Sequence, residues 1–425
     1  MKFYSLKTTI AALSIFASLS STAAIANSPK VLPTFATNVA EQLPAEQVNF
    51  QLSSFEADNA EFYLKRGNTR YEQKNYKEAI QDYNQAIKIN PNYVQAYFQR
   101  GITLRTIGNF QQSIADFTTM LSINPNNAQA YLNRGVSYYN WGKAQKAIAD
   151  FNLALQIEPD NAQAYRNRGV ARTSQKDLEG AISDFNLALQ INFNYAEAYL
   201  GRGIARRTMG DRTGAISDFN LALQIEPNNA QIYRNRGVAR AALKDSKGAI
   251  ADFNQALRIS PNYAEAYLNR GIVRRMLGDS SGALADFNIA LRIEPNNAQV
   301  YRNQGIAYLR QKQYQNAIAS FQTALRINPK YAEAYLNQGV ARRSQGDLKG
   351  SIVNFNQAVR INPRYAEAYQ LRATTREFLG DKKGARADLQ IAAELFLQQN
   401  KIQSYQQALK AIDQITIALL DKPYF

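Results

Sequence analysis

A 34-residue period constrains this chain more than any other feature. Eight prolines, from Pro91 to Pro363, occur at intervals of 34 residues, and the one position in this series without proline is Phe193. When each copy is numbered from Ala60, position 4 is tyrosine in all ten copies, position 8 is glycine in nine, and position 20 is alanine or serine in all ten. Position 24 is aromatic in nine copies and position 27 is alanine in nine. A unit this short cannot bury its apolar face alone, so the period predicts copies stacked in an array.

Each copy has the pattern of two helices of about 14 residues. The apolar and small residues at positions 4, 8, 20, 24 and 27 recur at helical spacing within two segments. Glycine at position 8 and the small residue at position 20 leave room for the two helices to approach closely. Proline at position 32 cannot continue a helix, so it ends the second one. The predicted fold class is therefore all-α.

The series of aromatic, glycine, alanine, aromatic, alanine and proline at this period resembles the tetratricopeptide repeat family. The resemblance covers residues 60–399 and implies a right-handed α-solenoid of helix-turn-helix repeats, whose first helices line the concave face. Two departures from the family are tyrosine at position 4 and arginine at position 7. We expect a signal peptide over 1–26, a partly disordered linker over 27–59, ten tandem repeats over 60–399, and a capping helix and tail over 400–425.

The first 26 residues have the three parts of a secretory signal. Lys2 and Lys7 form a basic start, residues 8–19 are mostly apolar, and small residues precede a cleavage site after Ala26. A helix over residues 8–19 rises only about 18 Å, whereas a bilayer core is about 30 Å thick. We therefore expect export to a periplasm, an organelle-type lumen or the cell exterior, with no membrane span once the signal is cleaved. An uncleaved membrane anchor is the alternative.

The composition excludes most catalytic chemistry. The 425 residues include no cysteine and no histidine, which rules out disulfides, thiol nucleophiles, iron–sulfur clusters and Ser–His triads. The many carboxylates fall mostly on positions repeated throughout the array. We therefore predict that the chain is not an enzyme and has no catalytic residue, no metal site and no cofactor. The net charge of +16 favours an acidic partner.

Two positions of the repeat change together. In eight copies position 7 is arginine and position 23 is aspartate, whereas the other two copies carry Gln304 with Ser320 and Gln338 with Asn354. Pairing each aspartate with the next copy's arginine would set Asp286 against Gln304. We therefore predict an ion pair between the two helices of one repeat, with a structural role. The eight predicted pairs are Arg66/Asp82, Arg100/Asp116, Arg134/Asp150, Arg168/Asp184, Arg202/Asp218, Arg236/Asp252, Arg270/Asp286 and Arg372/Asp388.

A second set of arginines defines the candidate binding surface. Positions 2, 5, 9 and 12 share one side of the first helix, because steps of three and four residues keep side chains aligned. From the fourth copy onward, arginine alternates between positions 5 and 12 with a 68-residue period, and Arg105 is an earlier example at position 12. This pattern would give the concave groove a staggered basic lining. The candidate residues are Arg166, Arg234 and Arg302 at position 5, and Arg105, Arg207, Arg275 and Arg343 at position 12.

Position 6 supplies a second candidate set, because it is asparagine in six copies. These residues are Asn133, Asn167, Asn235, Asn269, Asn303 and Asn337. The row resembles the asparagine ladder of the O-linked GlcNAc transferases, which holds an extended peptide by its backbone. An amide can both donate and accept a hydrogen bond, so a row of amides can bind main chain without requiring a particular side chain. Duplication of a 68-residue unit would also copy these residues whether or not they bind a ligand.

Together these patterns predict a non-enzymatic interaction scaffold in the cell envelope. It would bind acidic proteins or extended peptides in a basic concave groove. One alternative is an accessory subunit of an envelope-processing enzyme complex. Another is a nucleic-acid binder, which the net charge allows but the export signal opposes.

Overall fold

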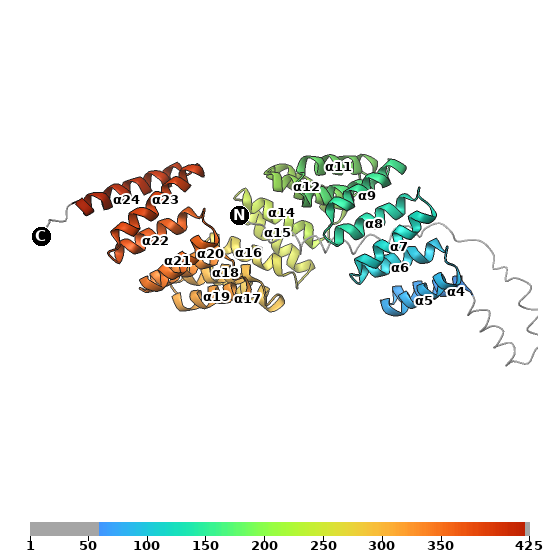
Figure 1. The fold of residues 1–425 in the computed structure, drawn as a ribbon, viewed down its shortest axis with the longest axis horizontal. Coiled ribbons are helices and arrows are strands. Elements are labelled where there is room, and N and C mark those ends of the chain that lie inside the picture. Colours follow the sequence, from blue (N-terminus) through green and yellow to red (C-terminus); the bar gives the residue numbers. More distant parts are fainter. Residues whose placement is uncertain (1–58, 421–425) are drawn as a thin grey trace, which may run out of the picture. The chain divides into compact units, whose positions relative to one another are not determined.

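The computed structural model describes residues 59–420 (Figure 1). These residues form twenty-one helices, of which twenty make ten pairs and one follows the last pair. The first helices of the pairs are α4 (Ala60–Glu72), α6 (Val94–Thr106), α8 (Ala128–Asn140), α10 (Ala162–Ser174), α12 (Ala196–Met209), α14 (Ala230–Ala242), α16 (Ala264–Met276), α18 (Ala298–Arg310), α20 (Ala332–Ser344) and α22 (Ala366–Phe378). The second helices are α5 (Tyr76–Ile89), α7 (Phe110–Ile123), α9 (Ala144–Ile157), α11 (Leu178–Ile191), α13 (Arg212–Ile225), α15 (Ser246–Ile259), α17 (Ser280–Ile293), α19 (Tyr314–Ile327), α21 (Leu348–Ile361) and α23 (Lys382–Gln398). The prediction of an all-α solenoid of helix pairs is confirmed.

The ends of the chain are only partly described. The predicted signal peptide and almost all of the predicted linker lie outside the described residues, so those two predictions stay open. The last pair is followed by α24 (Ile402–Leu420), which packs against α23 within the segment predicted as a cap.

The ten pairs fall into two compact units, one ending at Ile225 and the other beginning at Glu226. Within each unit, the first helices of successive repeats pack directly against one another, as α10 does against α12 and α18 against α20. The second helices of successive repeats make at most marginal contact within the described residues. Each unit is therefore curved with its first helices on the inner side, which we call the inner face.

The glycine at position 8 and the aromatic residue at position 24 set the spacing of each helix pair. Phe185 is fully buried, and a Cβ added to Gly169 would lie 3.0 Å from its ring and 3.2 Å from the carbonyl oxygen of Ala181. The same arrangement recurs from Gly67 with Tyr83 to Gly339 with Phe355. The predicted reason for the glycine, close approach of the two helices, is therefore confirmed.

The turn between the helices of a pair needs a left-handed residue at position 15. Six copies place glycine there, including Gly278 with φ 91°. The other four copies place lysine there with φ between 60° and 66°, as at Lys244. A side chain in this conformation is strained, because its Cβ crowds the following carbonyl group. The turn geometry is therefore the same in all ten copies, although only six have the residue best suited to it.

Candidate functional site

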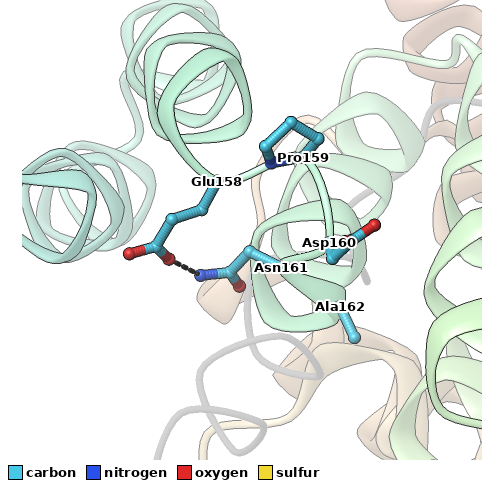
Figure 2. A pocket seen from close by; sticks show the side chains of 5 residues that line it. All are labelled: Glu158, Pro159, Asp160, Asn161 and Ala162. Atoms are coloured by element: carbon cyan, nitrogen blue, oxygen red, sulfur yellow. Dashed lines mark hydrogen bonds between the residues drawn. The ribbon is translucent and has the colours of Figure 1, made fainter.

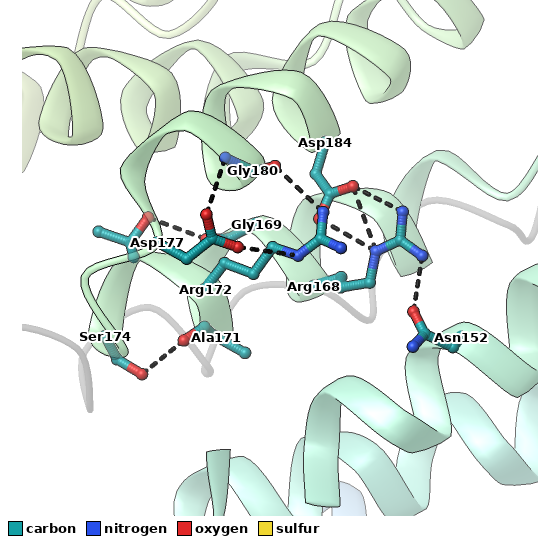
Figure 3. A network of polar contacts seen from close by, with 10 residues as sticks. Asn152, Arg168, Gly169, Ala171, Arg172, Ser174, Asp177, Gly180 and Asp184 are labelled. Atoms are coloured by element: carbon teal, nitrogen blue, oxygen red, sulfur yellow. Dashed lines mark hydrogen bonds and ion pairs between the residues drawn. The ribbon is translucent and has the colours of Figure 1, made fainter. Parts of the chain in front are cut away.

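The predicted ion pair between the two helices of a repeat is present, and it is part of a larger network (Figure 3). The Arg168 guanidinium donates from Nη2 to Asp184 Oδ1 over 2.6 Å and from Nε to both carboxylate oxygens. The Asp184 side chain is only 1% exposed, so these contacts replace its hydration. All eight predicted Arg–Asp pairs form.

A second arginine at position 11 contacts the same aspartate, which the sequence analysis did not predict. Arg172 Nη1 lies 2.8 Å from Asp184 Oδ2, and its Nε lies 3.5 Å from Asp177 Oδ2. Asp177 in turn accepts a hydrogen bond from the backbone N–H of Gly180 and so caps α11. A Cβ at Gly180 would lie 2.3 Å from the Asp177 carboxylate, so the glycine leaves space for this cap. The signal was available, because arginine at position 11, aspartate at 16 and glycine at 19 occur together in six copies.

The network also joins neighbouring repeats. Arg168 Nη1 donates to Asn152 Oδ1 on the preceding second helix over 2.7 Å, and its guanidinium carbon lies 5.2 Å from the centroid of the Tyr165 ring. The two copies without charged residues at positions 7 and 23 keep a hydrogen bond between these two positions. Ser320 donates to Gln304 over 2.8 Å, and Asn354 donates to Gln338 over 2.6 Å. The covariation in the sequence is therefore the exchange of a buried ion pair for a buried neutral pair.

The inner-face arginines behave differently. We use this name for the seven candidates Arg105, Arg166, Arg207, Arg234, Arg275, Arg302 and Arg343. Leaving Arg207 aside, none of them makes an ion pair with a carboxylate of residues 59–420, although all are at least partly buried. The Nε–H groups of Arg166, Arg234 and Arg302 are buried and donate to no acceptor within the described residues. Residues 59–420 therefore contain one class of arginine neutralised by aspartate and, leaving Arg207 aside, an inner-face class that forms no ion pair within those residues.

Arg105 shows how these side chains lie between repeats. Its Nη1 donates to the backbone carbonyl of Asn133 over 3.3 Å and to Asn133 Oδ1 over 3.0 Å, from α6 to α8. Burial lowers the pKa of Arg105 to about 10. Arg343 similarly reaches from α20 to Thr374 Oγ1 on α22, over 2.9 Å. Neutral acceptors thus orient these guanidinium groups without cancelling their charge.

Tyrosine and glutamate also lie on this face. Arg302 lies 5.8 Å from the centroid of the Tyr331 ring, and its charge partly opposes the rise in the Tyr331 pKa that burial causes. Glu333, at position 2 of the next copy, acts on the same tyrosine in the opposite direction. Tyr263 has the same relation to Arg234 and Glu265. The inner face is thus a mixed surface that carries both arginine and the glutamates of position 2.

The six candidate asparagines are less available than the arginines. Asn167, Asn235 and Asn303 are buried. The Nδ2 groups of Asn133, Asn235 and Asn303 donate to the carbonyl oxygen four residues earlier in their own helices. The Nδ2 atoms of Asn269 and Asn337 are buried without a partner in the described residues. The ladder therefore stays a prediction, and it places fewer free amides on the inner face than the sequence pattern implies.

Other sites that a ligand could use are poorly developed. A shallow depression is lined by five consecutive residues, Glu158–Ala162, in the turn between α9 and α10 (Figure 2). Its polar groups are engaged locally, because Asn161 donates to Glu158 over 2.8 Å and caps α10 through Ala164. Residues 59–420 contain no group of three or more carboxylates that could hold a metal ion. In the same residues, no helix is both long and apolar enough to cross a bilayer.

Comparisons with known proteins agree with this geometry. Models described as "TPR repeat" or "Tetratricopeptide repeat" match residues 67–108, 94–127, 128–161, 153–197, 196–229, 241–278, 298–331 and 332–365. The chain belongs to the tetratricopeptide repeat family, whose fold is a scaffold for protein–protein interaction. No curated protein matches the sequence significantly.

Solved structures also match this chain. A tetratricopeptide repeat protein from Parabacteroides merdae matches with a TM-score of 0.50 and 21% identity, over 58% of this chain and 98% of that one. Yeast Tom70 matches with a TM-score of 0.48 and 15% identity, over 85% of this chain and 99% of that one. PilF of Pseudomonas aeruginosa matches with a TM-score of 0.45 and 19% identity, over 50% of this chain and 97% of that one.

Proposed function

We propose that this protein is a non-enzymatic scaffold of the cell envelope that binds acidic proteins or extended acidic peptides on its inner face. The first helices supply the contact surface, and the inner-face arginines supply the attraction for carboxylates. The Arg–Asp network has a separate role, which is to hold each helix pair and its neighbour in place. The seven inner-face arginines belong to the binding surface, with the candidate asparagines in a subsidiary role.

One observation carries the proposal, namely the contrast between the two classes of arginine. Arg274 and Arg275 are adjacent in α16, yet Arg274 lies 2.9 Å from Asp286 Oδ2 whereas Arg275 has no carboxylate partner in the described residues. A partly buried cation without a counterion is unfavourable for stability alone. An anionic partner that supplies the missing carboxylates would convert this cost into binding free energy. Guanidinium groups suit this role because they bind carboxylates with two parallel hydrogen bonds.

The binding test compares two matched variants of the mature chain. One changes four inner-face arginines to glutamine, and the other changes four exposed arginines of the second helices in the same unit. The inner variant is Arg234→Gln, Arg275→Gln, Arg302→Gln and Arg343→Gln, and the outer variant is Arg258→Gln, Arg292→Gln, Arg326→Gln and Arg360→Gln. Both variants lose four positive charges, so nonspecific attraction falls equally in both.

Each protein is used to capture and crosslink partners from the envelope fraction of its own cells. We expect the outer variant to recover the same partners as the unmodified protein and the inner variant to lose them. Equal recovery by the inner variant would place the binding surface elsewhere. Loss of all partners in both variants would instead favour attraction by net charge, as for a nucleic-acid binder.

The proposed location has its own test. Cleavage after Ala26 predicts that the mature protein begins at Asn27, which the mass of the purified protein measures directly. A protein that retains residues 1–26 and stays in the membrane fraction would support the anchor alternative.

A further inference from the structure

One side of each later first helix is covered by the second helix of the preceding repeat. Position 3 lies on that side, because Ala96 of α6 packs in one cluster with Ala86 of α5. Position 10 lies there as well, since the hydroxyl oxygens of Ser137 on α8 and Ser113 on α7 are 2.9 Å apart. Both positions are buried in every copy from the second to the tenth. They therefore mark the side of a first helix that faces the preceding repeat.

The first copy leaves this side open. Within residues 59–420, no helix precedes α4. Thr69 at position 10 is exposed, and position 3 holds a half-buried Phe62 where the other nine copies have alanine, valine or isoleucine. The Arg66 side chain at position 7 is 41% exposed, whereas the arginines of the other seven ion pairs are 12–20% exposed. A repeat buries its faces only on its neighbours, so this side of α4 lacks a cover.

The repeat continues in the residues before α4. Counted backwards from Ala60, residues 42–55 fall on positions 17–30, where the other copies have their second helices. Ala45 falls on position 20, which is alanine or serine in all ten copies, and Phe55 falls on position 30, which is isoleucine in nine. Residues 56–60 read Glu-Ala-Asp-Asn-Ala, and residues 158–162, at the same positions, read Glu-Pro-Asp-Asn-Ala. The sequence pattern of a second helix and its following turn therefore extends one half repeat beyond the array.

We propose that residues 44–55 form a helix that docks on the open side of α4, as a half repeat at the start of the array. Ala45, Leu52 and Phe55 share one side of such a helix, because steps of seven and three residues keep side chains aligned. The connection has the usual length. Phe55 lies five residues before the first residue of α4, as Ile89 lies five residues before the first residue of α6.

The departures from the repeat pattern fit a second helix that has no first helix of its own. Val48 replaces the aspartate of position 23, and Asn49 replaces the aromatic residue of position 24. In the other copies these two positions contact the first helix of the same repeat, through the arginine of position 7 and the glycine of position 8. Pro29 and Pro33 fall on positions 4 and 8, where proline would break a first helix. Pro44 is instead at the start of the proposed helix, where proline is favoured.

The contacts of later copies define how the helix would lie. Positions 27 and 3 pack together across neighbouring repeats, so Leu52 would cover Phe62. Positions 20 and 10 touch in the same way, so Ala45 would lie against Thr69. Docking would bury the aromatic surface of the first repeat. It would also close this end of the array to a second copy of the chain, much as α24 covers α23 at the other end.

The test is disulfide formation in the mature chain, whose natural sequence contains no cysteine. The variant Ala45→Cys with Thr69→Cys places two thiols at the proposed contact. Ser113→Cys with Ser137→Cys is the positive control, because these side chains touch in the described structure. Ala45→Cys with Glu61→Cys is the negative control. Glu61 is exposed and closer in sequence to residue 45, but it lies eight residues along α4 from Thr69, or about 12 Å.

Docking predicts an intramolecular disulfide between residues 45 and 69 that forms at least about tenfold faster than the one between residues 45 and 61. Non-reducing electrophoresis measures both rates. An undocked segment would join residues 45 and 61 at least as fast, and that result would overturn the proposal. A disulfide between two chains in the variant with cysteines at 45 and 69 would also overturn it, because the open side would then belong to a second copy.

Hydrogen exchange gives an independent readout. Leu52→Asp places a charge in the proposed contact, whereas Gln47→Asp places it at position 22, which is exposed in the first four copies. We expect amide exchange in α4 to accelerate about tenfold or more in Leu52→Asp only, with exchange in α20 unchanged in both variants. Equal exchange in α4 of the two variants would count against docking. Neither experiment involves the inner-face arginines, so this proposal and the proposed function can fail separately.

Discussion

Changing Asp184 to asparagine should destabilise the protein more than changing Asp184 and Arg168 together. In Asp184→Asn, the guanidinium groups of Arg168 and Arg172 lose their shared counterion and keep their charges. The side chains of the two arginines are only 15% and 25% exposed, so water restores part of the lost solvation but not all of it. Breaking a buried pair by removing one partner costs about 3–5 kcal/mol, and the partial exposure of the arginines favours the lower end, about 3 kcal/mol.

The double variant Arg168→Gln with Asp184→Asn recreates a pair that the chain already contains. Gln338 and Asn354 occupy the same two positions in the ninth copy and are joined by a 2.6 Å hydrogen bond. The arginine at position 11 keeps an acceptor beside this neutral pair, because Arg342 donates to the carbonyl oxygen of Gly350 over 3.3 Å, as Arg172 does to that of Gly180 over 3.2 Å. We expect the double variant to lose only about 1 kcal/mol, which is the size of a typical net hydrogen-bond contribution.

Urea unfolding followed by circular dichroism measures these differences. Because repeats interact mainly with their neighbours, the curves should be fitted with a nearest-neighbour model rather than with a single transition. The reasoning predicts that Asp184→Asn is about 2 kcal/mol more destabilising than the double variant. It is refuted if Asp184→Asn is no more destabilising than the double variant, since the stranded charges would then cost nothing.

Two further predictions concern glycine positions. Lys244→Gly should raise the free energy of unfolding by about 0.5–1 kcal/mol, because it removes a side chain from a left-handed turn. Gly278→Ala should lower it by a similar amount, because it adds a side chain to the same turn. Urea midpoints of the two variants that shift in the same direction would contradict this. Gly237→Ala should lower the free energy of unfolding by about 1–3 kcal/mol, because the new Cβ would lie 2.7 Å from the Phe253 ring. A midpoint unchanged from the unmodified protein would show that the helix pair can separate without cost.

The fold was predictable because the sequence repeats the same constraints ten times. Gly169 and Phe185 alone would be weak indicators, but their equivalents recur in phase through the array. The ion pair within each repeat was predictable for a different reason. Gln304/Ser320 and Gln338/Asn354 break the pattern at both positions at once, and this identifies which residues touch.

Other features depend on how far a side chain reaches, which the pattern does not specify. The co-occurrence of Arg172 with Asp177 and Gly180 does not reveal its partner, because its contact with Asp184 depends on the packing of two helices. Arg310 is the only arginine at position 13 of the repeat, so the repeat pattern does not predict a role for it. Burial of Asn235 likewise follows from packing between neighbouring helices, and the spacing of asparagines alone does not reveal it.

The most direct test of the central claim is the composition of the peptides that the inner face selects. A random peptide library is presented to the unmodified mature chain and to the inner and outer variants, each with four arginines replaced by glutamine. The measured quantity is the enrichment of aspartate and glutamate among the bound peptides. The account predicts strong acidic enrichment for the unmodified chain and the outer variant, and its loss in the inner variant. Acidic enrichment that is absent from the unmodified chain, or unchanged in the inner variant, would contradict the assignment of the inner-face arginines to ligand binding.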